Sequence, residues 1–414
     1  MIDTDVAIVG AGAAGLATAI FARRSNSRLS VAVLDGAKTI GAKILVSGGS
    51  RCNVTNRSVT ERDFWGGRRS IVRGILRAFP VADTVDFFRE IGVTLHEEAN
   101  GKLFPDSNRS RDVLSALVNE TARTGAALQS GCRVLAVAPT AGGFAVATSR
   151  GDVHARSVVL ATGGQSLPKT GSDGAGYDIA RGFGHTIVPT TPALTPLLLA
   201  DDDAMHRALS GVSQDVELSI WIDGPVATRL TGAMLWTHFG VSGPVVLNAS
   251  RHWLRAQIEN RQVRVTVSFR PGIPLERVDA EWTRRGRTDP RTTIVSLLSR
   301  DVPASTARAL LEHLGIAPDV AAAHFSRDDR RTLAHALVAH SLPVVGARGY
   351  TYAEATAGGV ALTEIDPSTM ESRMRPGLFL VGEMLDVDGR IGGFNFQWAW
   401  STGFVAGRAL AYNT

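Results

Sequence analysis

The chain has 414 residues, of which 44% are hydrophobic and 20% are charged, and its formal net charge is +5. This length favours two or three domains, and the composition is that of a soluble globular protein without the ~18-residue apolar run that spans a bilayer. Only four of the 44 basic residues are lysine, and the arginines are scattered among 39 acidic residues, which disfavours a nucleic-acid partner.

The first residues and the cysteines exclude further classes of protein. Asp3 and Asp5 lead straight into an apolar run, so we expect no secretion leader and a cytoplasmic protein. Cys52 and Cys132 form no Cys-x-x-Cys pair, and the ten histidines show no paired metal spacing. These patterns disfavour a dithiol redox centre and predict no metal site.

A short apolar run enters the pattern Gly10, Gly12 and Gly15. In a dinucleotide-binding unit the first glycine makes the tight exit from a strand, the second lets the backbone approach a pyrophosphate, and the third lets a helix pack on the sheet. Residues 13–24 predict that helix, whose N–H groups and positive dipole end would face the phosphate. A second apolar run ends at Asp35, 20 residues beyond Gly15, where a carboxylate can accept ribose hydroxyls.

Small, polar and basic residues dominate the segment 43–56, which predicts a loop whose N–H groups face an anion or a ring edge. Residues 70–124 are predicted to be mostly helical. Apolar runs between 133 and 161 predict a β-meander whose last strand ends in Thr162-Gly163-Gly164. Such small residues permit close approach to a cofactor, although an ordinary glycine turn has the same pattern.

The middle of the chain changes character beyond Pro189. Alternation of apolar and polar residues over 216–222 and 263–269 predicts an antiparallel sheet, closed or half-covered. Between residues 274 and 342 the sequence shows only helical segments, separated by prolines.

The C-terminal stretch returns to the chemistry of the N-terminus. An apolar run at 378–381 ends in Gly382-Glu383, and a glycine-rich turn at 389–393 precedes a helix that runs to about residue 410. We therefore predict a discontinuous nucleotide-binding domain over 1–189 and 350–414, a β-barrel-like insert over 190–272 and 343–349, and a helical subdomain over 273–342.

FAD and NAD proteins both use the first glycine motif, so the rest of the chain must decide between them. The strand ending at 161–164, the pair Gly382-Glu383 and the helix start at Gly392-Gly393 would add three contacts to one long bound ligand, which favours FAD. Residues 171–176 show glycine spacing but follow no apolar strand, so a second nucleotide domain is not expected. Either NAD(P)H binds transiently, or the substrate reduces the flavin and oxygen or another acceptor reoxidises it.

Seven segments carry a resemblance that covers nearly the whole chain: residues 10–15, 43–56, 101–105, 161–164, 237–244, 356–360 and 382–400. Together they resemble a bacterial flavoprotein family that includes aminoacetone oxidase and the flavoprotein of bile-acid dehydroxylation. The resemblance implies an α/β fold with a Rossmann-type FAD-binding domain like that of glutathione reductase, interrupted by a β-barrel-like domain that carries a nested helical subdomain. Ser50 stands where the family has a third consecutive glycine, which leaves the local backbone angle open.

The resemblance also implies cofactor contacts. Asp35 would hold the ribose and Val134 the adenine, the latter through its backbone, while the segments 47–53 and 393–396 with Gly382 and Glu383 would hold the pyrophosphate, ribityl chain and ring. The complete set of expected FAD contacts is Gly10, Gly12, Ala13, Ala14, Gly15, Asp35, Lys43, Ser47, Gly48, Gly49, Arg51, Cys52, Asn53, Val134, Ala161, Thr162, Gly163, Gly382, Glu383, Asp386, Gly393, Phe394, Asn395 and Phe396.

Three residues are candidates for the chemistry itself. Cys52 is either a reactive thiol or a small residue packed beside the cofactor. Arg51 either stabilises an anionic flavin or substrate carboxylate, or forms a structural salt bridge. His238, in a glycine-flanked loop, is either a general acid or base or a hydrogen-bonded residue that stabilises its turn.

We expect an FAD-dependent oxidoreductase in which flavin N5 exchanges hydride with a small organic substrate held between the flavin and the β insert. Amine oxidation with oxygen and NAD(P)H-dependent reduction of a conjugated C=C bond are the two forms considered. A flavoprotein that modifies a transfer RNA base is an alternative, suggested by the pI of about 9.6. A flavin-binding protein without turnover is another.

Overall fold

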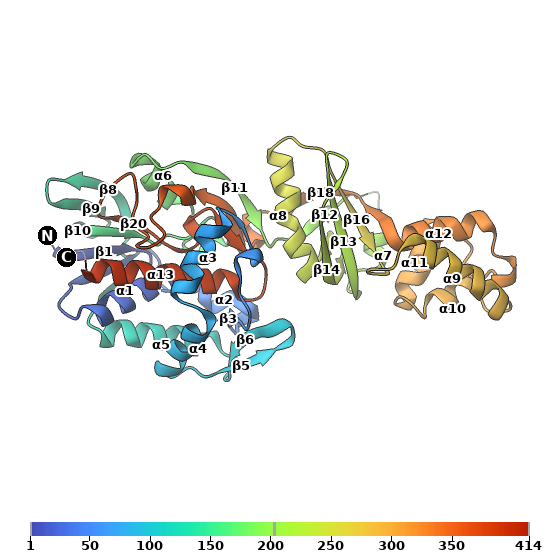
Figure 1. Ribbon diagram of the computed structural model, residues 1–414, viewed down its shortest axis with the longest axis horizontal. Coiled ribbons are helices and arrows are strands. Elements are labelled where there is room, and N and C mark those ends of the chain that lie inside the picture. The colour runs from blue at the N-terminus through green and yellow to red at the C-terminus, as the bar shows by residue number, and fades with distance from the viewer. Residues whose placement is uncertain (1, 202–203, 413–414) are drawn as a thin grey trace. The chain divides into compact units, whose positions relative to one another are not determined.

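The computed structural model describes residues 2–201 and 204–412 (Figure 1). The chain divides into two compact units: unit 1 consists of Met1–Pro192 and Ala353–Thr414, and unit 2 is Ala193–Tyr352. Each unit has its own cluster of buried hydrophobic residues. The chain thus leaves unit 1 once and returns to it with its last segment, while the finer division into three domains stays a prediction.

Seven strands form the main sheet of unit 1: β1 (Ile2–Val9), β2 (Val31–Asp35), β7 (Ala127–Ser130), β8 (Val134–Thr140), β9 (Gly143–Thr148), β10 (Gly151–Leu160) and β20 (Leu378–Leu380). Their order is β7-β2-β1-β10-β9-β8, and β20 pairs with β10. The strands β7, β2, β1, β10 and β20 pair in parallel, whereas β8, β9 and β10 form an antiparallel meander, as predicted. Parallel pairing directs several strand ends to one edge of the sheet, where the cofactor contacts are predicted.

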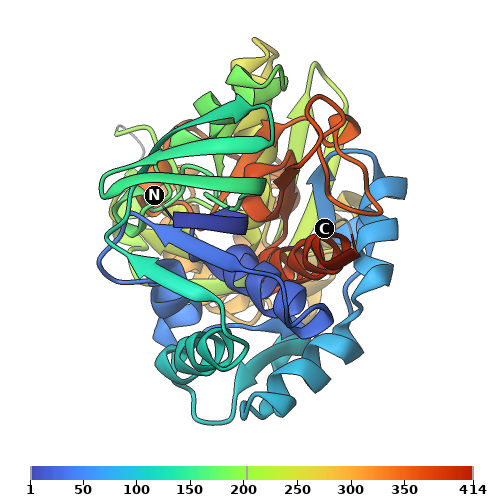
Figure 2. The same cartoon turned by 90° about the vertical axis from the view of Figure 1, so that its left-hand side faces the viewer.

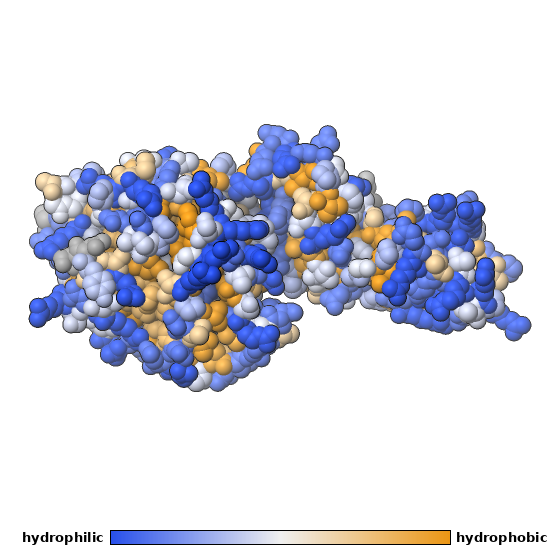
Figure 3. Space-filling model, viewed as in Figure 1, coloured by the Kyte–Doolittle hydropathy of each residue, from blue (hydrophilic) through white to orange (hydrophobic). Residues whose placement is uncertain are grey.

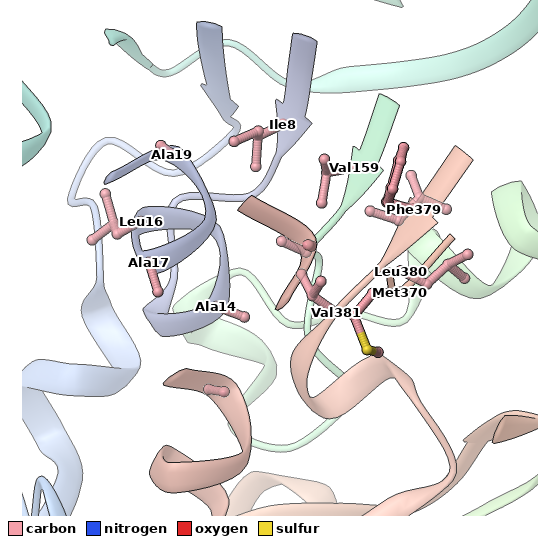
Figure 4. Packing of buried hydrophobic residues seen from close by; sticks show 14 of the residues in the cluster. Ile8, Ala14, Leu16, Ala17, Ala19, Val159, Met370, Phe379, Leu380 and Val381 are labelled. Atoms are coloured by element: carbon pink, nitrogen blue, oxygen red, sulfur yellow. The ribbon is translucent and has the colours of Figure 1, made fainter. Parts of the chain in front are cut away.

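The helices α1 (Ala13–Ser25) and α13 (Phe394–Tyr412) lie side by side, as Figure 2 shows in blue and dark red. They approach closely because glycines of α13 face the backbone of α1: a Cβ atom on Gly407 would lie 2.8 Å from the Ala22 nitrogen and the Thr18 oxygen. Leu16 and Ala17 of α1 belong to the same buried cluster as Val159 and Phe379 of the sheet (Figure 4). Residues of α1 and of α13 therefore belong to the same hydrophobic core.

The predicted helical stretch 70–124 contains α3 (Arg69–Ala78), α4 (Val81–Glu90) and α5 (Ser110–Arg123). It also contains a hairpin that the sequence did not reveal, β5 (Leu95–Glu98) and β6 (Lys102–Pro105), which joins β3 (Thr55–Asn56) in a small sheet. The signal was missing because β5 reads Leu-His-Glu-Glu and lacks apolar alternation. The predicted loop 43–56 is also corrected, since α2 (Ala42–Ser50) covers its first part.

The remaining elements of unit 1 are short. They are β4 (Phe64–Gly66), α6 (Ala175–Gly182), β11 (Ile187–Ala193), β19 (Ala355–Val360), β21 (Val387–Gly389), and the single-turn helices η1 (Glu61–Asp63), η2 (Ala99–Gly101), η3 (Pro168–Thr170), η6 (Leu362–Glu364) and η7 (Gly382–Met384). The strand β11 pairs with β19, and β4 pairs with β21. Segments before and after unit 2 in the chain are thereby joined within unit 1.

Unit 2 contains a second seven-stranded sheet, in the order β17-β16-β13-β14-β15-β12-β18, and every recorded pairing in it is antiparallel. Its strands are β12 (Leu197–Leu199), β13 (Ser213–Ile222), β14 (Val226–Thr237), β15 (Gly240–Ser242), β16 (Val263–Ser268), β17 (His340–Leu342) and β18 (Val344–Ala347). Pro343 alone separates β17 from β18, the two ends of this order. The predicted antiparallel sheet is confirmed, while its barrel-like form stays a prediction.

The helices of unit 2 are α7 (Ala204–Ala208), α8 (Pro244–Ile258), α9 (Leu275–Thr288), α10 (Ile294–Leu298), α11 (Ala304–His313), α12 (Arg327–Ala339) and the single turns η4 (Ala322–His324) and η5 (Tyr350–Tyr352). The four helices α9 to α12 confirm the helical segment predicted over 274–342. On the face drawn in Figure 3 they present mostly hydrophilic residues. Thr266 and Ser268, on the polar side of the β16 alternation, are nevertheless buried, and α12 packs on this strand.

A pair of helix glycines tests the packing of α13 on α1. Gly407→Ala should lower the free energy of unfolding by about 1–3 kcal/mol, because the new methyl group overlaps backbone atoms of α1. Gly74→Ala in α3, where a Cβ meets nothing within 4 Å, should raise it by up to ~1 kcal/mol through helix propensity. Urea unfolding followed by circular dichroism measures both, and equal effects would show that α1 and α13 do not pack as described.

Candidate functional site

The glycines of the first motif bring the ends of β1 and β10 and the start of α1 together. A Cβ on Gly15 would overlap the Gly10 carbonyl oxygen, and one on Gly10 would overlap the carbonyl group of Ala161, whose N–H donates to Val9. By contrast, a Cβ on Gly12 would meet no protein atom within 4 Å. The backbone at the start of α1 is therefore open to a ligand, and the first N–H groups of the helix, including those of Ala13 and Ala14, have no intrahelical acceptor.

Asp35 ends β2 beside this motif. Its carboxylate accepts from the Ala11 N–H at 2.6 Å and from the Ala37 N–H at 2.7 Å. The N–H of Cys132 donates to the Asp35 carbonyl at 2.7 Å, so the segment leading to Val134 runs along the end of β2. The structure thus brings the residues predicted for ribose and adenine close to the glycine motif.

The run from Ser47 to Asn53 folds as a tight turn after the first helical residues of α2. Gly48, Gly49, Ser50 and Cys52 all have positive φ, with Ser50 at 67°. Ser50 therefore keeps the left-handed backbone that a third glycine would adopt without strain. The Ser47 hydroxyl donates to Ile44 O at 2.8 Å, and Ser47 O accepts from the Cys52 N–H at 3.0 Å.

Three side chains in the first two turns of α13 donate hydrogen bonds to backbone carbonyl oxygens of neighbouring loops. The indole N–H of Trp398 donates to Gly382 O at 3.1 Å, and that of Trp400 donates to Val54 O at 2.9 Å. Gln397 donates to Phe79 O at 2.9 Å, and its amide oxygen accepts from the hydroxyls of Thr55 and Thr84 at 2.7 and 3.0 Å. These buried groups fix the loops after α2 and β20 relative to α13.

The turn before α13 is fixed in the same way. Gly393 has a φ of 93°, a Cβ on it would overlap the carbonyl of Thr55, and its N–H donates at 3.1 Å to the amide oxygen of Asn53. Asn395 binds both the N–H and the carbonyl of Gly389, at 2.7 and 3.0 Å.

Two rings and one acid of the expected set have structural contacts nearby. Phe394 is buried against Phe64, with the ring centroids 6.3 Å apart, and Phe396 stacks on Trp400 at 5.6 Å. Asp386 lies between η7 and β21, and its backbone pairs with Val360 and with Gly67. The structure thus brings all expected contacts of the C-terminal segment to one end of α13.

Lys43 and Glu383 form an ion pair with a Nζ–Oε2 distance of 2.6 Å. The other carboxylate oxygen accepts from the Ser166 hydroxyl and the Thr356 N–H, both at 2.8 Å. Burial opposes ionisation of Glu383, but the Lys43 charge and these hydrogen bonds outweigh it and lower the pKa of the carboxyl. A Cβ on Gly163 would lie 3.8 Å from Glu383 Oε2, so this cluster borders the end of β10.

Ser166 and Thr356 were missed as site residues by the sequence reasoning. Thr356 begins the run Thr-Ala-Gly-Gly-Val, which carried part of the family resemblance without an assigned role. Its hydroxyl accepts from the N–H groups of Gln165 and Ser166 at 2.8 and 3.0 Å. A polar residue that follows a strand ending in two glycines was the signal that could have indicated Ser166.

The candidate catalytic residues have different surroundings. Arg51 pairs with Glu98 at 2.6 Å, lowers the pKa of that carboxyl and lies 4.1 Å from the centroid of the Phe104 ring, which favours the salt-bridge interpretation. Cys52 is fully buried, and burial raises the pKa of its thiol to about 12, which favours packing over reactivity. His238 belongs to unit 2, whereas Arg51 and Cys52 belong to unit 1, and its exposed ring contacts Phe239 with a distance of 5.1 Å between the ring centroids.

Across residues 2–201 and 204–412, no helix is long and apolar enough to cross a membrane. A sequence profile described as "HI0933-like protein Rossmann domain" matches residues 4–409.

Two kinds of curated relative match nearly the whole chain. A protein from Clostridium scindens named 3-dehydro-bile acid delta(4,6)-reductase is 34% identical over 406 residues, which are 98% of this chain and 98% of that protein. A protein from Escherichia coli K12 named ribosomal RNA dihydrouridine synthase is 32% identical over 409 residues, again 98% of each chain. A protein of the same name from Haemophilus influenzae is 32% identical over 408 residues, with the same shares.

Solved structures share the fold at lower identity. Quinol fumarate reductase from E. coli has a TM-score of 0.50 and 16% identity, over 99% of this chain and 70% of that one. A 3-ketosteroid delta1-dehydrogenase from Sterolibacterium denitrificans has a TM-score of 0.51 and 14% identity, over 100% of both chains. These similarities place the fold among the α/β Rossmann-type flavoprotein folds.

The burial of both cysteines predicts that the folded protein is inert to thiol reagents. With a pKa of about 12, the Cys52 thiol is on the order of 10⁻⁴ ionised at mildly alkaline pH, and Cys132 is 1% exposed. Titration with a chromogenic disulfide should detect no thiol in the native state and two after unfolding. If one thiol of the native protein reacts rapidly, and this reaction is absent in Cys52→Ser, the prediction that Cys52 is inert is wrong.

Substitutions at two glycines of the first motif should separate ligand binding from folding. Gly12→Ala should fold as the wild type does but retain bound dinucleotide about tenfold less tightly, equal to ~1.4 kcal/mol, because its methyl group enters open space at the helix start. Gly15→Ala should lose stability as well, because its Cβ overlaps Gly10. Thermal unfolding and the flavin-to-protein absorbance ratio measure both properties. Full flavin occupancy in Gly12→Ala would show that this turn does not hold the ligand.

Proposed function

This chain belongs to the HI0933-like family of FAD-dependent Rossmann-type oxidoreductases, and from this membership we propose that it reduces a carbon–carbon double bond conjugated to a carbonyl group. The observation that carries the proposal is the chemistry shared by the names of its relatives. A 3-dehydro-bile acid delta(4,6)-reductase and a dihydrouridine synthase both saturate such a bond, the first in a steroid enone and the second in a uracil ring.

The described residues fit FAD as the resident cofactor. The open backbone at Gly12 and the start of α1 would receive the pyrophosphate, and Asp35 would bind a ribose. Lys43 and Glu383 would lie along the middle of the cofactor, while the turn at Gly393 would place the N-terminus of α13 at its ring. When bound, the flavin supplies hydride transfer, so the protein has to bind, orient and protonate.

Reduction is favoured over amine oxidation because the relatives reported above are named a reductase and synthases. A reductant of the nicotinamide class, NADH or NADPH, would supply the electrons. The substrate we propose is a small enone, in keeping with the scattered charge of the chain.

A uracil base of ribosomal RNA is a second candidate substrate. It is favoured by the dihydrouridine synthases, which match 98% of the chain at 32% identity. A flipped uracil and a small enone present the same unsaturated carbonyl group, so one site could reduce either.

Anaerobic stopped-flow mixing tests the proposed reaction. NADPH or NADH should bleach the flavin, and a steroid enone should restore its colour with formation of the saturated ketone. Ribosomal RNA transcribed without modification is the matched alternative, with dihydrouridine detected by mass spectrometry. If RNA reoxidises the flavin and the enone does not, ribosomal RNA is the substrate. If neither NADH nor NADPH reduces the flavin, or if only an amine reduces it, the proposal is overturned.

A further inference from the structure

One carboxyl group beside the Lys43–Glu383 pair is not part of its hydrogen-bond cluster. Glu354 directly precedes β19, and its carbonyl oxygen lies 3.5 Å from the Ser166 hydroxyl. Thr356, two residues later, donates its N–H to Glu383. The Glu354 side chain itself is exposed. Within residues 2–201 and 204–412 the Glu354 carboxyl has no hydrogen bond, and its backbone is held next to the residues that we propose to contact the cofactor.

Lys102 connects Glu354 to the turn before α13. The positive charge of Lys102, on β6, acts on the Glu354 carboxyl. On its other side Lys102 reaches that turn, since a Cβ on Gly392 would lie 3.7 Å from Lys102 Cγ. Glu354 therefore neighbours both groups of expected cofactor contacts, the Lys43–Glu383 pair and the start of α13.

The pKa values of the two glutamates are shifted in opposite directions. Glu354 keeps surface accessible to solvent, but the protein that surrounds its carboxyl raises the pKa by desolvation, and Lys102 only partly offsets this. Glu383 instead has a lowered pKa, because Lys43 and two hydrogen bonds stabilise its charge against burial. Two carboxyl groups with pKa values shifted apart are the arrangement that assigns one as an acid and the other as a fixed charge.

We propose that Glu354 is the catalytic acid that protonates the substrate during reduction of the conjugated double bond, an inference that rests on the function proposed above. Hydride arriving at the β-carbon forms a C–H bond, and the π electrons move to the α-carbon. The α-carbon then takes the proton from the Glu354 carboxyl oxygen. The two electrons come from the reduced nicotinamide, and the carboxylate regains its proton from solvent, so the bond gains one hydride and one proton.

Other acidic groups of the site are less suited to this role. Glu383 is held as a carboxylate by Lys43. Cys52 is fully buried, and its thiol has a pKa of about 12, so it is a poor proton donor. Glu354 combines a raised pKa with an exposed side chain that can reach a substrate and be reprotonated by water.

Substitution of Glu354 should separate the two half-reactions. Glu354→Gln should leave flavin reduction by NADPH within about twofold of wild type but slow flavin reoxidation by the enone about 100-fold or more. The exposed Glu312→Gln on α11 is the matched control and should change neither rate. An equal slowing of both half-reactions, or none, would overturn the proposal.

The pH profile adds a readout that a merely structural role would not change. The acid must be protonated, so enone reduction should fall as pH rises through the pKa of Glu354. Lys102→Met removes the charge that stabilises the carboxylate and should shift this limb to higher pH. If the fall in the rate of enone reduction occurs at the same pH in Lys102→Met, in Glu354→Asp and in the wild type, Glu354 is not the catalytic acid.

Infrared difference titration measures the protonation of the Glu354 carboxyl in the absence of turnover. The wild-type protein should show the C=O stretch of a protonated carboxylic acid near neutral pH, and Glu354→Gln should lack it. Glu354 found ionised there overturns this inference even if the enzyme reduces enones. A wild type that reduces no enone overturns the proposed function instead.

Discussion

The candidate site depends on hydrogen bonds from one helix to the carbonyl oxygens of loops that are distant in sequence. Trp398 and Trp400 donate to Gly382 and Val54, and Gln397 ties Thr55, Thr84 and Phe79 together. All of these groups are buried, so each lost bond would leave a carbonyl oxygen or a threonine hydroxyl unsatisfied, at a cost of about 1–3 kcal/mol. The buried tryptophans of the C-terminal run, Trp398 and Trp400, thus act by positioning the backbone of these loops.

The sequence predicted the Rossmann part of the fold because its signals are local. Apolar runs followed by Gly10, Gly12 and Gly15 specify strand, turn and helix within 20 residues, and the meander is delimited by its own glycines. The hairpin of β5 and β6 escaped because its polar residues lack alternation and its pairing with β3 spans about 45 residues. The local sequence pattern does not indicate a strand that forms because it pairs with a strand distant in sequence.

As with the fold, the sequence predicted the part of the candidate site that depends on local patterns. Glycines that permit close approach could be named from their spacing, and the structure brings Gly10, Gly163, Gly382 and Gly393 to the ends of strands and helices as expected. The partners of Glu383 were not predictable, since Ser166 and Thr356 are separated from it by 217 and 27 residues and meet it only in three dimensions. The burial that raises the pKa of the Cys52 thiol is likewise a tertiary property, which a run of small and polar residues does not indicate.

The return of the chain to unit 1 has a consequence for how the protein folds. The strand β20 and the helix α13 complete the sheet and the candidate site of unit 1, yet the whole of unit 2 separates them in sequence from β1 and α1. Until this segment docks during folding, α1 lacks its neighbouring helix and the loops at Val54 and Gly382 lack their indole donors. Closing contacts across some 400 residues is slow compared with forming local ones. The candidate site therefore forms only when this long-range docking is complete, and the apolar face of α1 stays open to non-native contacts until α13 covers it.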